Sequence, residues 1–240
     1  MKLIEYISII WQPCLSKMCL PIEPKWSALR LQRIIKKSNL TYKYEVLIMA
    51  KLLFFAGSVR KESINKKLAK LASETAQKAG AEVTYIDLKD FEMPLYDGDI
   101  EAVNGIPQNA KKLKKIFVAH DGFFIASPEY NSSMPPLVNN TLDWISRPHK
   151  KNERSLIAFQ GKIAALGAVS PGALGGLRGL VPLRMMLGNI GVTVVPSQVA
   201  VGSGFQAFDE DGMLKDERQI SMLKATINML VKTTDRMATN

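Results

Sequence analysis

Strand-like and helical patterns alternate along the chain from residue 51 onwards. Runs typical of strands occupy residues 52–56, 82–88, 122–127, 161–170 and 192–197. Apolar residues at helical spacing follow these runs, over residues 64–79, 107–120, 137–146, 175–191 and 216–232. Strands that alternate with helices are typical of βαβ units, so the pattern predicts a parallel sheet with right-handed crossovers.

The first strand and the number of strands narrow the fold class. Residues 52–56 are continuously apolar, as expected of a strand that is buried on both faces. Five strands within roughly 190 residues fit a flavodoxin-like doubly wound sheet better than a six-stranded dinucleotide fold. We therefore predict an α/β fold with a five-stranded parallel sheet, strand order 2-1-3-4-5, and helices on both faces. Ligands of such sheets bind beyond the carboxyl ends of the strands, which indicates the loops after strands one, three and four.

Residues 1–48 differ from the rest of the chain. Their apolar stretches are interrupted by Pro13, Pro21 and Pro24, and no signal-peptide cleavage pattern follows. Eight Lys or Arg and three Glu give them five of the ten net positive charges. We expect residues 1–48 to be an extension that is poorly ordered or outside the native domain, with Met49 as a natural or alternative start. Residues 49–240 would then form the functional domain.

Composition disfavours several classes of function. Beyond residue 48 the net charge is mildly positive, which favours anionic ligands such as phosphorylated cofactors. A basic stripe with interleaved aromatic residues would indicate a nucleic-acid partner, and the sequence has no such stripe. No apolar run approaches the ~20 residues of a membrane helix. We therefore expect a cytoplasmic protein without a nucleic-acid or membrane partner.

The usual catalytic side chains are scarce. Both cysteines, Cys14 and Cys19, lie within residues 1–48, so the remaining chain has no thiolate nucleophile and no cysteine metal site. Two isolated histidines, His120 and His149, argue against a histidine metal cluster or a Ser-His-Asp triad. If the chain is an enzyme, a cofactor is expected to carry the difficult chemistry.

The loop after the first predicted strand has the composition of an anion site. Ser58, Arg60, Ser63 and Asn65 cluster where the next helix begins, and the amides and dipole of a helix N-terminus favour an anion. The Lys-Ser/Thr ending of a P-loop is missing, so the loop suits a monophosphate rather than a triphosphate with Mg²⁺. The same residues also fit an ordinary helix start, with Ser63 as the N-cap.

Two further loops have unusual compositions. The loop after strand three places Pro128, Pro135 and Pro136 around Tyr130, and a rigid loop of this kind can line a planar heterocycle. The loop of residues 170–178 is rich in glycine, which lets the backbone approach a ligand closely. Each loop alone also fits a surface turn or a flexible connection. The three together favour a site for a planar ligand that carries a phosphate.

Three motifs in this order resemble those of the NADPH-dependent FMN reductase family. Residues 57–69 (GSVRKESINKKLA) resemble its phosphate loop, 128–144 (PEYNSSMPPLVNNTLDW) its second motif, and 170–178 (SPGALGGLR) its third. The resemblance extends over residues 51–201. Pro136 stands where that family usually has glycine, and Asn139 where it usually has lysine. These departures bear on substrate choice more than on FMN binding.

The resemblance implies a flavodoxin-like fold, non-covalently bound FMN, NADPH or NADH as co-substrate, and a homodimer or homotetramer. The flavin would pass hydride to a small-molecule oxidant in a ping-pong reaction, with a quinone, chromate, an azo compound or free flavin as the acceptor. The phosphate contacts implied by the motif come from Ser58, Arg60, Ser63 and Asn65. The implied isoalloxazine contacts come from Pro128, Glu129, Tyr130 and Asn131 on one edge, and from Ser170 and Gly172 on the other.

Two other functions stay open on the sequence alone. A flavodoxin-like electron carrier without its own NAD(P)H site would share the fold, although such carriers are usually strongly acidic and this chain is basic. A nucleotide-binding or regulatory domain without a flavin would share the phosphate loop. The 2′-phosphate of NADPH has Arg147, Arg154 and Arg178 as candidate partners, and each is also compatible with an ordinary surface charge.

Overall fold

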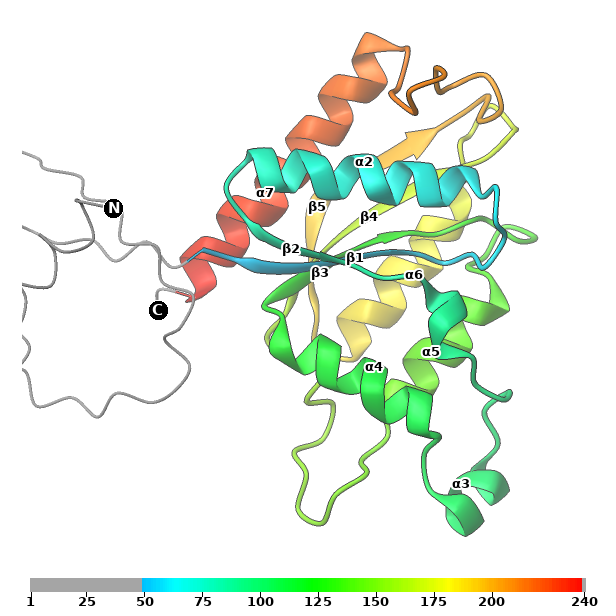
Figure 1. Ribbon diagram of the computed structural model, residues 1–240, viewed down its shortest axis with the longest axis vertical. Helices are drawn as coiled ribbons and strands as arrows, with labels where there is room; N and C mark the ends of the chain where they lie inside the picture. The colour runs from blue at the N-terminus through cyan, green and yellow to red at the C-terminus, as the bar shows by residue number, and fades with distance from the viewer. Residues whose placement is uncertain (1–48, 239–240) are drawn as a thin grey trace, which may run out of the picture. The chain divides into compact units, whose positions relative to one another are not determined.

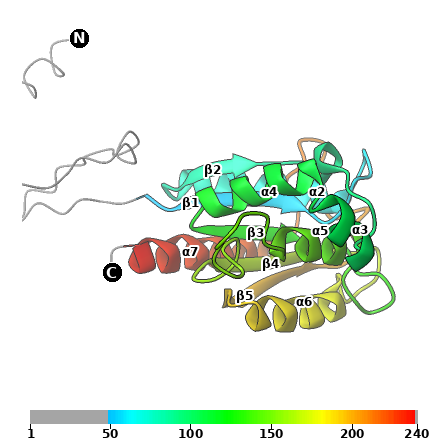
Figure 2. The same cartoon turned by 90° about the horizontal axis from the view of Figure 1, so that it is seen from below.

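Five parallel strands form the centre of the computed structural model, which describes residues 49–238. The strands are β1 (Lys51–Ala56), β2 (Glu82–Tyr85), β3 (Gly122–Ala126), β4 (Ile163–Val169) and β5 (Thr193–Val201). Their order is β2-β1-β3-β4-β5, and Figure 2 shows them following one another in this order. The predicted fold class and strand order are confirmed. The predicted extension, residues 1–48, lies outside the described residues.

Helices cover both faces of the sheet, as predicted (Figure 1). One face carries α2 (Ile64–Lys78) and α7 (Glu217–Ala238). The other face carries α4 (Gln108–Ala119), α5 (Pro136–Ser146) and α6 (Leu177–Asn189). None of the helices within the described residues combines the length and the apolar character needed to cross a membrane.

Strand β1 shows how the sequence builds this sandwich. Leu52 and Phe54 face α2 and α7, whereas Leu53 and Phe55 face α4, α5 and α6. All four side chains are at most 1% exposed. Burying each of them contributes about 1.5–3 kcal/mol, so β1 is held from both faces. Its carboxyl end, and the loop that follows, are therefore fixed in the middle of the sheet.

The connection between β2 and α4 contains more structure than the sequence predicted. Strand β2 ends at Tyr85 rather than at residue 88, because Asp87 accepts a hydrogen bond from the Lys89 amide at 3.0 Å and starts the 3₁₀ helix η2 (Leu88–Phe91). A short helix, α3 (Gly98–Asn104), follows with Asp97 as its N-cap. The buried Trp144 holds this connection, since its Nε1 donates to the Pro94 carbonyl at 2.7 Å.

Strand β5 extends beyond the predicted range of residues 192–197. Its pairing with β4 shifts between Ala164 and Leu166, so the edge strand accommodates Pro196 in a bulge and continues to Val201. The Arg184 guanidinium donates to the Val195 carbonyl at 2.9 Å, which gives this backbone acceptor in the bulge a hydrogen-bond partner. The longer strand brings Val201 beside the loop that follows β4.

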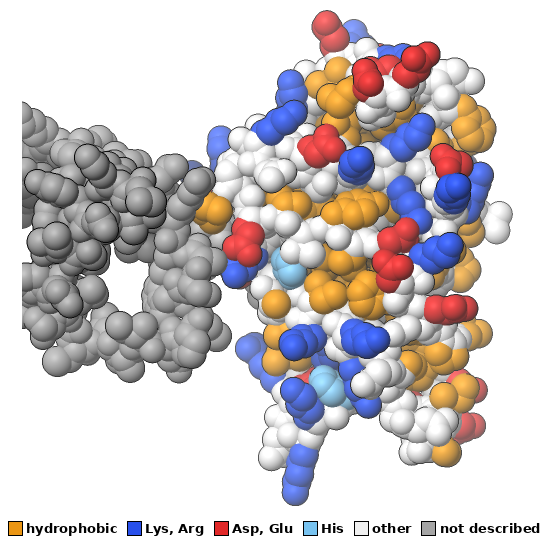
Figure 3. Space-filling view, in the orientation of Figure 1, with side chains coloured by type: hydrophobic (Ala, Val, Ile, Leu, Met, Phe, Trp, Pro, Cys, Tyr) orange, Lys and Arg blue, Asp and Glu red, His pale blue; other side chains and the backbone are white. Residues whose placement is uncertain are grey.

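Surface charge is mixed on the side of the molecule drawn in Figure 3. Lys and Arg side chains are spread over that face, with Asp and Glu among them. The positive charge of the described residues is therefore not gathered into one continuous stripe on that face. An anion site therefore depends on the donors of particular loops rather than on a broad charged surface.

Gly57→Ala is expected to destabilise the protein by about 1–3 kcal/mol through overpacking. A Cβ at position 57 would lie 2.3 Å from Cγ2 of Val138 and 3.3 Å from Cδ of Pro128. Urea unfolding of the ligand-free protein, followed by circular dichroism, measures the change.

Gly188→Ala is the matched control, because a Cβ at this position of α6 meets nothing within 4 Å. That variant is expected to be as stable as the wild type or up to about 1 kcal/mol more stable. If Gly57→Ala unfolds at the same urea concentration as the wild type, the close contact of Gly57 with Val138 of α5 is contradicted.

Candidate functional site

Three loops meet at the carboxyl edge of the sheet, as the strand order predicts. Loop one (residues 57–63) follows β1, loop two (127–135) follows β3, and loop three (170–176) follows β4. Strand β3 lies between β1 and β4, so loop two lies between the other two loops. Gly57 donates its amide to the Ala126 carbonyl at 2.9 Å, and Ser127 donates to Gly167 at 2.7 Å.

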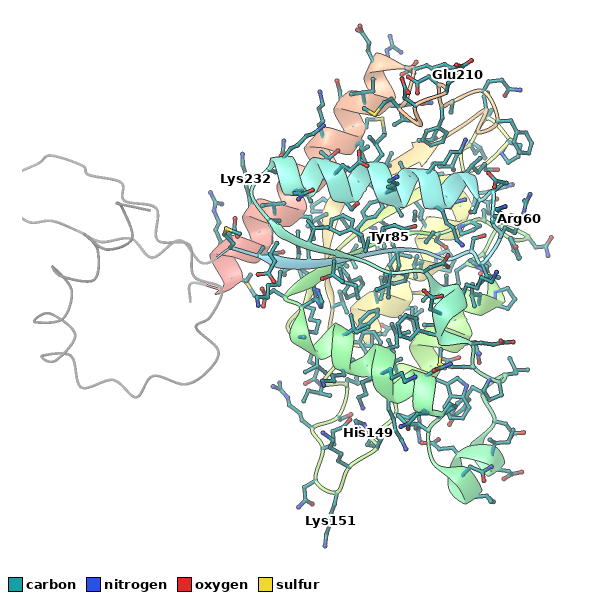
Figure 4. All side chains as sticks on the ribbon, in the orientation of Figure 1. Arg60, Tyr85, His149, Lys151, Glu210 and Lys232 are labelled. Carbon is teal, nitrogen blue, oxygen red and sulfur yellow. The ribbon has the colours of Figure 1, made fainter. Side chains whose placement is uncertain are left out.

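Loop one presents hydrogen-bond donors at the start of α2. Ser58 and Ser63 are 7% and 6% exposed, and each hydroxyl oxygen accepts a backbone amide, from Arg60 and Lys66 respectively. Their hydroxyl protons have no acceptor among the described residues, and neither do the Ser58 and Val59 amides. Figure 4 shows Arg60 at the same edge, projecting away from the sheet. The loop has the donors that an anion requires.

Asn65 makes a different contact from the one implied by the motif. Its amide group donates to the Val169 carbonyl and accepts from the Val169 amide, both at 2.9 Å. The side chain is 3% exposed. Asn65 thus ties the first turn of α2 to the end of β4, and a direct phosphate contact stays a prediction for this residue.

The charge next to loop one is partly neutralised. Lys66 Nζ donates to Asp87 Oδ2 at 2.5 Å, which joins α2 to the segment after β2. Burial acts to raise the pKa of Asp87, but the hydrogen bond and charge of Lys66, together with Lys89, outweigh it and hold that pKa below its usual value. Arg60 has no ion-pair partner in the described part of the chain, so its charge remains available to an anion.

Loop two is a tight turn with an exposed aromatic ring. The amides and carbonyls of Tyr130 and Ser133 pair at 2.9 and 3.0 Å. Asn131 and Ser132 between them have φ of 51° and 65°, a conformation that costs energy for residues with a side chain. Tyr130 is 51% exposed. The turn therefore presents the Tyr130 ring to the open edge, while Pro128 packs against Gly57 of loop one.

Glu129 points from loop two towards the start of α6. Its Oε1 accepts hydrogen bonds from Arg178 Nη2 at 2.8 Å and Nε at 3.0 Å. Its Oε2 accepts the Gly179 amide at 3.1 Å. The structure thereby assigns Arg178, a candidate for the 2′-phosphate of NADPH, to an ion pair. Arg147 is also paired, with Glu101 at 2.9 Å, and Arg154 has no ion-pair partner within residues 49–238.

Loop three borders a hollow of about 250 Å³. Its lining includes Glu129, Ser170, Gly172, Leu174 and Arg178. Gly172 is exposed, and a Cβ there would meet only Ser170 Oγ at 3.9 Å. Gly175 instead allows close packing within the fold, because a Cβ at this position would lie 2.6 Å from the Val201 backbone. Only the first part of loop three is therefore open to a ligand.

Sequence reasoning missed the loop after β5. Gly204 donates its amide to the Ser170 carbonyl at 3.0 Å, which places Phe205 beside loop three with 69% of its surface exposed. A Cβ at Gly204 would lie 2.7 Å from both Val169 and Ile64. The Gly-Ser-Gly-Phe sequence of residues 202–205 was the available signal.

Both histidines make contacts away from these loops. His120 Nδ1 lies 2.7 Å from the Ile116 carbonyl and Nε2 lies 2.8 Å from Thr84 Oγ1. His149 lies 2.8 Å from Glu153, and Figure 4 shows it far from Arg60. Burial lowers the pKa of His149 despite the opposing charge of Glu153. Within residues 49–238, no cluster of His, Cys, Asp and Glu has the makings of a metal site.

Comparison with known proteins agrees with the three motifs. The sequence model of the family described as NADPH-dependent FMN reductase matches residues 50–206, a range that contains all three loops. A quinone reductase of Pseudomonas putida is 33% identical over 162 residues, which are 67% of this chain and 82% of that protein. An NAD(P)H-dependent FMN reductase of Pseudomonas aeruginosa is 30% identical over 181 residues, 75% of this chain and 92% of that protein.

A solved structure is also similar to this chain in fold and in sequence. The flavoenzyme NAD(P)H:(acceptor) oxidoreductase FerB from Paracoccus denitrificans matches with a TM-score of 0.65 and 26% identity, over 79% of this chain and 99% of that chain. The family match covers more than half of this chain and includes the edge at which the loops meet. The chain therefore belongs to the NADPH-dependent FMN reductase family of oxidoreductases.

Proposed function

We propose that this chain is an FMN-dependent enzyme that passes hydride from NADPH or NADH to a small oxidant, with a quinone as the expected acceptor. The family binds FMN and uses NAD(P)H as the electron donor. The observation that carries the proposal is that loops one, two and three leave the same edge of the sheet, with free donors in loop one at the start of α2 and an open hollow between loops two and three. Chromate, an azo compound and free flavin are the other acceptors to compare.

The donor set of loop one fits the phosphate of FMN. Ser58 and Ser63 are buried and keep a hydroxyl proton to donate, the Ser58 and Val59 amides are unpaired in the described chain, and Arg60 supplies a charge. This set fits a monophosphate and lacks the P-loop lysine that contacts further phosphates and the Ser/Thr that binds Mg²⁺. Hydrogen bonds to charged groups of this kind contribute about 1.5–3 kcal/mol each.

Loops two and three fit the edges of a flat ring. In this proposal Pro128, Glu129, Tyr130 and Asn131 of loop two would border one side of the ring, and Ser170 and Gly172, which line the hollow, would border the other. The amides of Ala173 and Leu174 have no hydrogen-bond partner among the described residues. We propose that these amides stabilise negative charge at the ring edge, since fixed donors act strongly where charge develops.

Bound FMN supplies the two-electron chemistry, and the protein supplies orientation and electrostatics. Loop one would anchor the phosphate, and the strained turn of loop two would hold the exposed Tyr130 ring beside the flavin. We propose a ping-pong order in which the nicotinamide leaves before the oxidant enters by the same open side. This order needs no histidine at the site, in agreement with the remote positions of His120 and His149.

Arg60→Ala is expected to weaken FMN binding about 10- to 100-fold, because the variant loses a charge-assisted contact to the phosphate. Fluorescence titration of the FMN-free protein measures the dissociation constant, and circular dichroism checks that the fold is unchanged. Lys61→Ala is the control, since the neighbouring Lys61 is also exposed and lies outside the donor set. Equal FMN affinity in Arg60→Ala and Lys61→Ala would remove Arg60 from the phosphate site.

Anaerobic mixing of the FMN-loaded protein with NADPH or NADH is expected to bleach the flavin absorbance. A stoichiometric quinone should then restore it, because hydride leaves through the same flavin. Stopped-flow absorbance spectroscopy measures both phases. A flavin that stays oxidised with either nicotinamide would point to an electron carrier without its own NAD(P)H site.

We also propose that the protein is a homodimer or homotetramer, supported by an exposed apolar strip. Leu174 and the α6 residues Leu177, Val181 and Met185 are 39–65% exposed, and the three helical residues share one face. Exposed apolar patches of this kind mark interaction surfaces. The strip begins at loop three, so association there would leave the hollow close to a subunit boundary.

Val181→Glu is expected to shift the protein towards monomers, because a charge would be buried in the proposed contact. Size-exclusion chromatography with light scattering measures the mass. Val118→Glu on α4 is the control, since Val118 is also exposed (42%) and lies outside the strip. A monomeric wild type would contradict the oligomer, and an unchanged mass for Val181→Glu would exclude this face.

A further inference from the structure

Glu129 and Arg178 form an ion pair, and the Glu129 carboxylate also binds the backbone amide of Gly179. The carboxylate receives two hydrogen bonds from the Arg178 guanidinium, at 2.8 and 3.0 Å, and one from the Gly179 amide at 3.1 Å. The Glu129 side chain is 9% exposed, whereas that of Arg178 is 60% exposed. A nearly buried carboxylate is therefore held by two consecutive residues of α6, through the solvated Arg178 side chain and the Gly179 backbone amide.

The helix contact completes the N-terminus of α6. Its N-cap, Gly176, has no side chain and a φ of 86°, so it cannot accept the amides of the first turn. Glu129 reaches this turn from loop two and accepts the amide of the third helical residue, Gly179. The negative carboxylate also lies at the positive end of the helix dipole.

Close packing fixes the distance between loop two and α6. A Cβ at position 179 would lie 2.9 Å from the Ser133 carbonyl oxygen and 3.2 Å from Cα of Glu129. A Cβ at Gly176 would lie 2.7 Å from Cβ of Ala168. Glycine at both positions lets the turn of loop two rest directly on the helix start, and the carboxylate contact then holds it there.

The charge of this pair lies at the wall of the hollow. Glu129 and Arg178 both line the hollow with Ser170 and Gly172. An unpaired carboxylate in this position would oppose the negative charge that a flavin gains on reduction. Arg178 neutralises that carboxylate, although its own exposure lets solvent screen part of the effect.

We propose that Glu129 and Arg178 are a positioning pair for the flavin, an inference that rests on the proposed function. They fix loop two against the start of α6 and keep the wall of the hollow electrically neutral where the ring binds. Arg178 thereby serves the geometry of the loops rather than the 2′-phosphate of NADPH.

The test compares Arg178→Gln, Glu129→Gln, the double variant and Arg178→Lys. Arg147→Gln is the matched control, because Arg147 makes a similar two-bond contact with Glu101 at the opposite end of α5 from loop two. The readouts are the FMN dissociation constant of the FMN-free protein, the midpoint potential of bound FMN, and the ratio of the KM values for NADPH and NADH.

Opposite shifts of the potential are the expected result. Arg178→Gln leaves an uncompensated carboxylate, so the midpoint potential falls and FMN binds about tenfold more weakly. Glu129→Gln leaves an uncompensated cation, so the potential rises, and the double variant returns towards the wild type. Arg178→Lys keeps the charge and stays near the wild-type potential. Arg147→Gln leaves the FMN dissociation constant and the midpoint potential unchanged.

Two results would overturn the inference. The first is that Arg178→Gln and Glu129→Gln both shift the midpoint potential in the same direction, or do not shift it, while FMN stays bound. The other is a tenfold rise in KM for NADPH alone in Arg178→Gln, which would make Arg178 a 2′-phosphate contact. If Arg178→Gln fails to fold, Glu129→Gln and Arg178→Lys carry the test. A wild type that binds no FMN would instead contradict the proposed function itself.

Discussion

The parallel pairing of β1, β3 and β4 is the constraint on which the site depends. Each loop begins with an amide bonded to the neighbouring strand: Gly57 to Ala126 at 2.9 Å, Ser127 to Gly167 at 2.7 Å, and Ser170 to Val201 at 3.1 Å. Because all strands run in the same direction, the three loops must leave the sheet at one edge. Loops that begin at residues 57, 127 and 170, and so are roughly 40 to 110 residues apart in sequence, thus become neighbours through the sheet.

Two buried polar side chains then fix the loops to one another. Asn65 bonds both backbone groups of Val169 and so joins α2 to the end of β4. Glu129 bonds the Gly179 amide and joins loop two to α6. In each case a side chain bonds the backbone of another element: Asn65 bonds the end of β4, and Glu129 bonds the first turn of α6. A site built on such contacts is rigid before a ligand arrives, which lowers the entropic cost of binding.

The features that sequence could predict are those with a local pattern. The apolar run of β1 indicated a strand buried on both faces, and the alternation of strands and helices indicated the sheet order. Loop one could be predicted as an anion site because Ser58, Arg60 and Ser63 lie close together in the sequence at a helix start. The short helix α3 and the bulge in β5 were missed, because a capping Asp97 and a proline in an edge strand both resemble loop signals.

Contacts between distant residues carry no local pattern, so the sequence did not indicate them. The phosphate contact implied for Asn65 stays a prediction, but nothing local indicated its hydrogen bonds to Val169, which is 104 residues away. The glycine-rich composition of loop three likewise gave no sign that Gly175 lies close to the backbone of Val201. The central claim is that one FMN occupies all three loops, and amide hydrogen exchange with and without FMN tests it most directly. Simultaneous protection of residues 58–63, 129–133 and 170–176 is the predicted result, and protection confined to a single loop, or lying elsewhere, would contradict it.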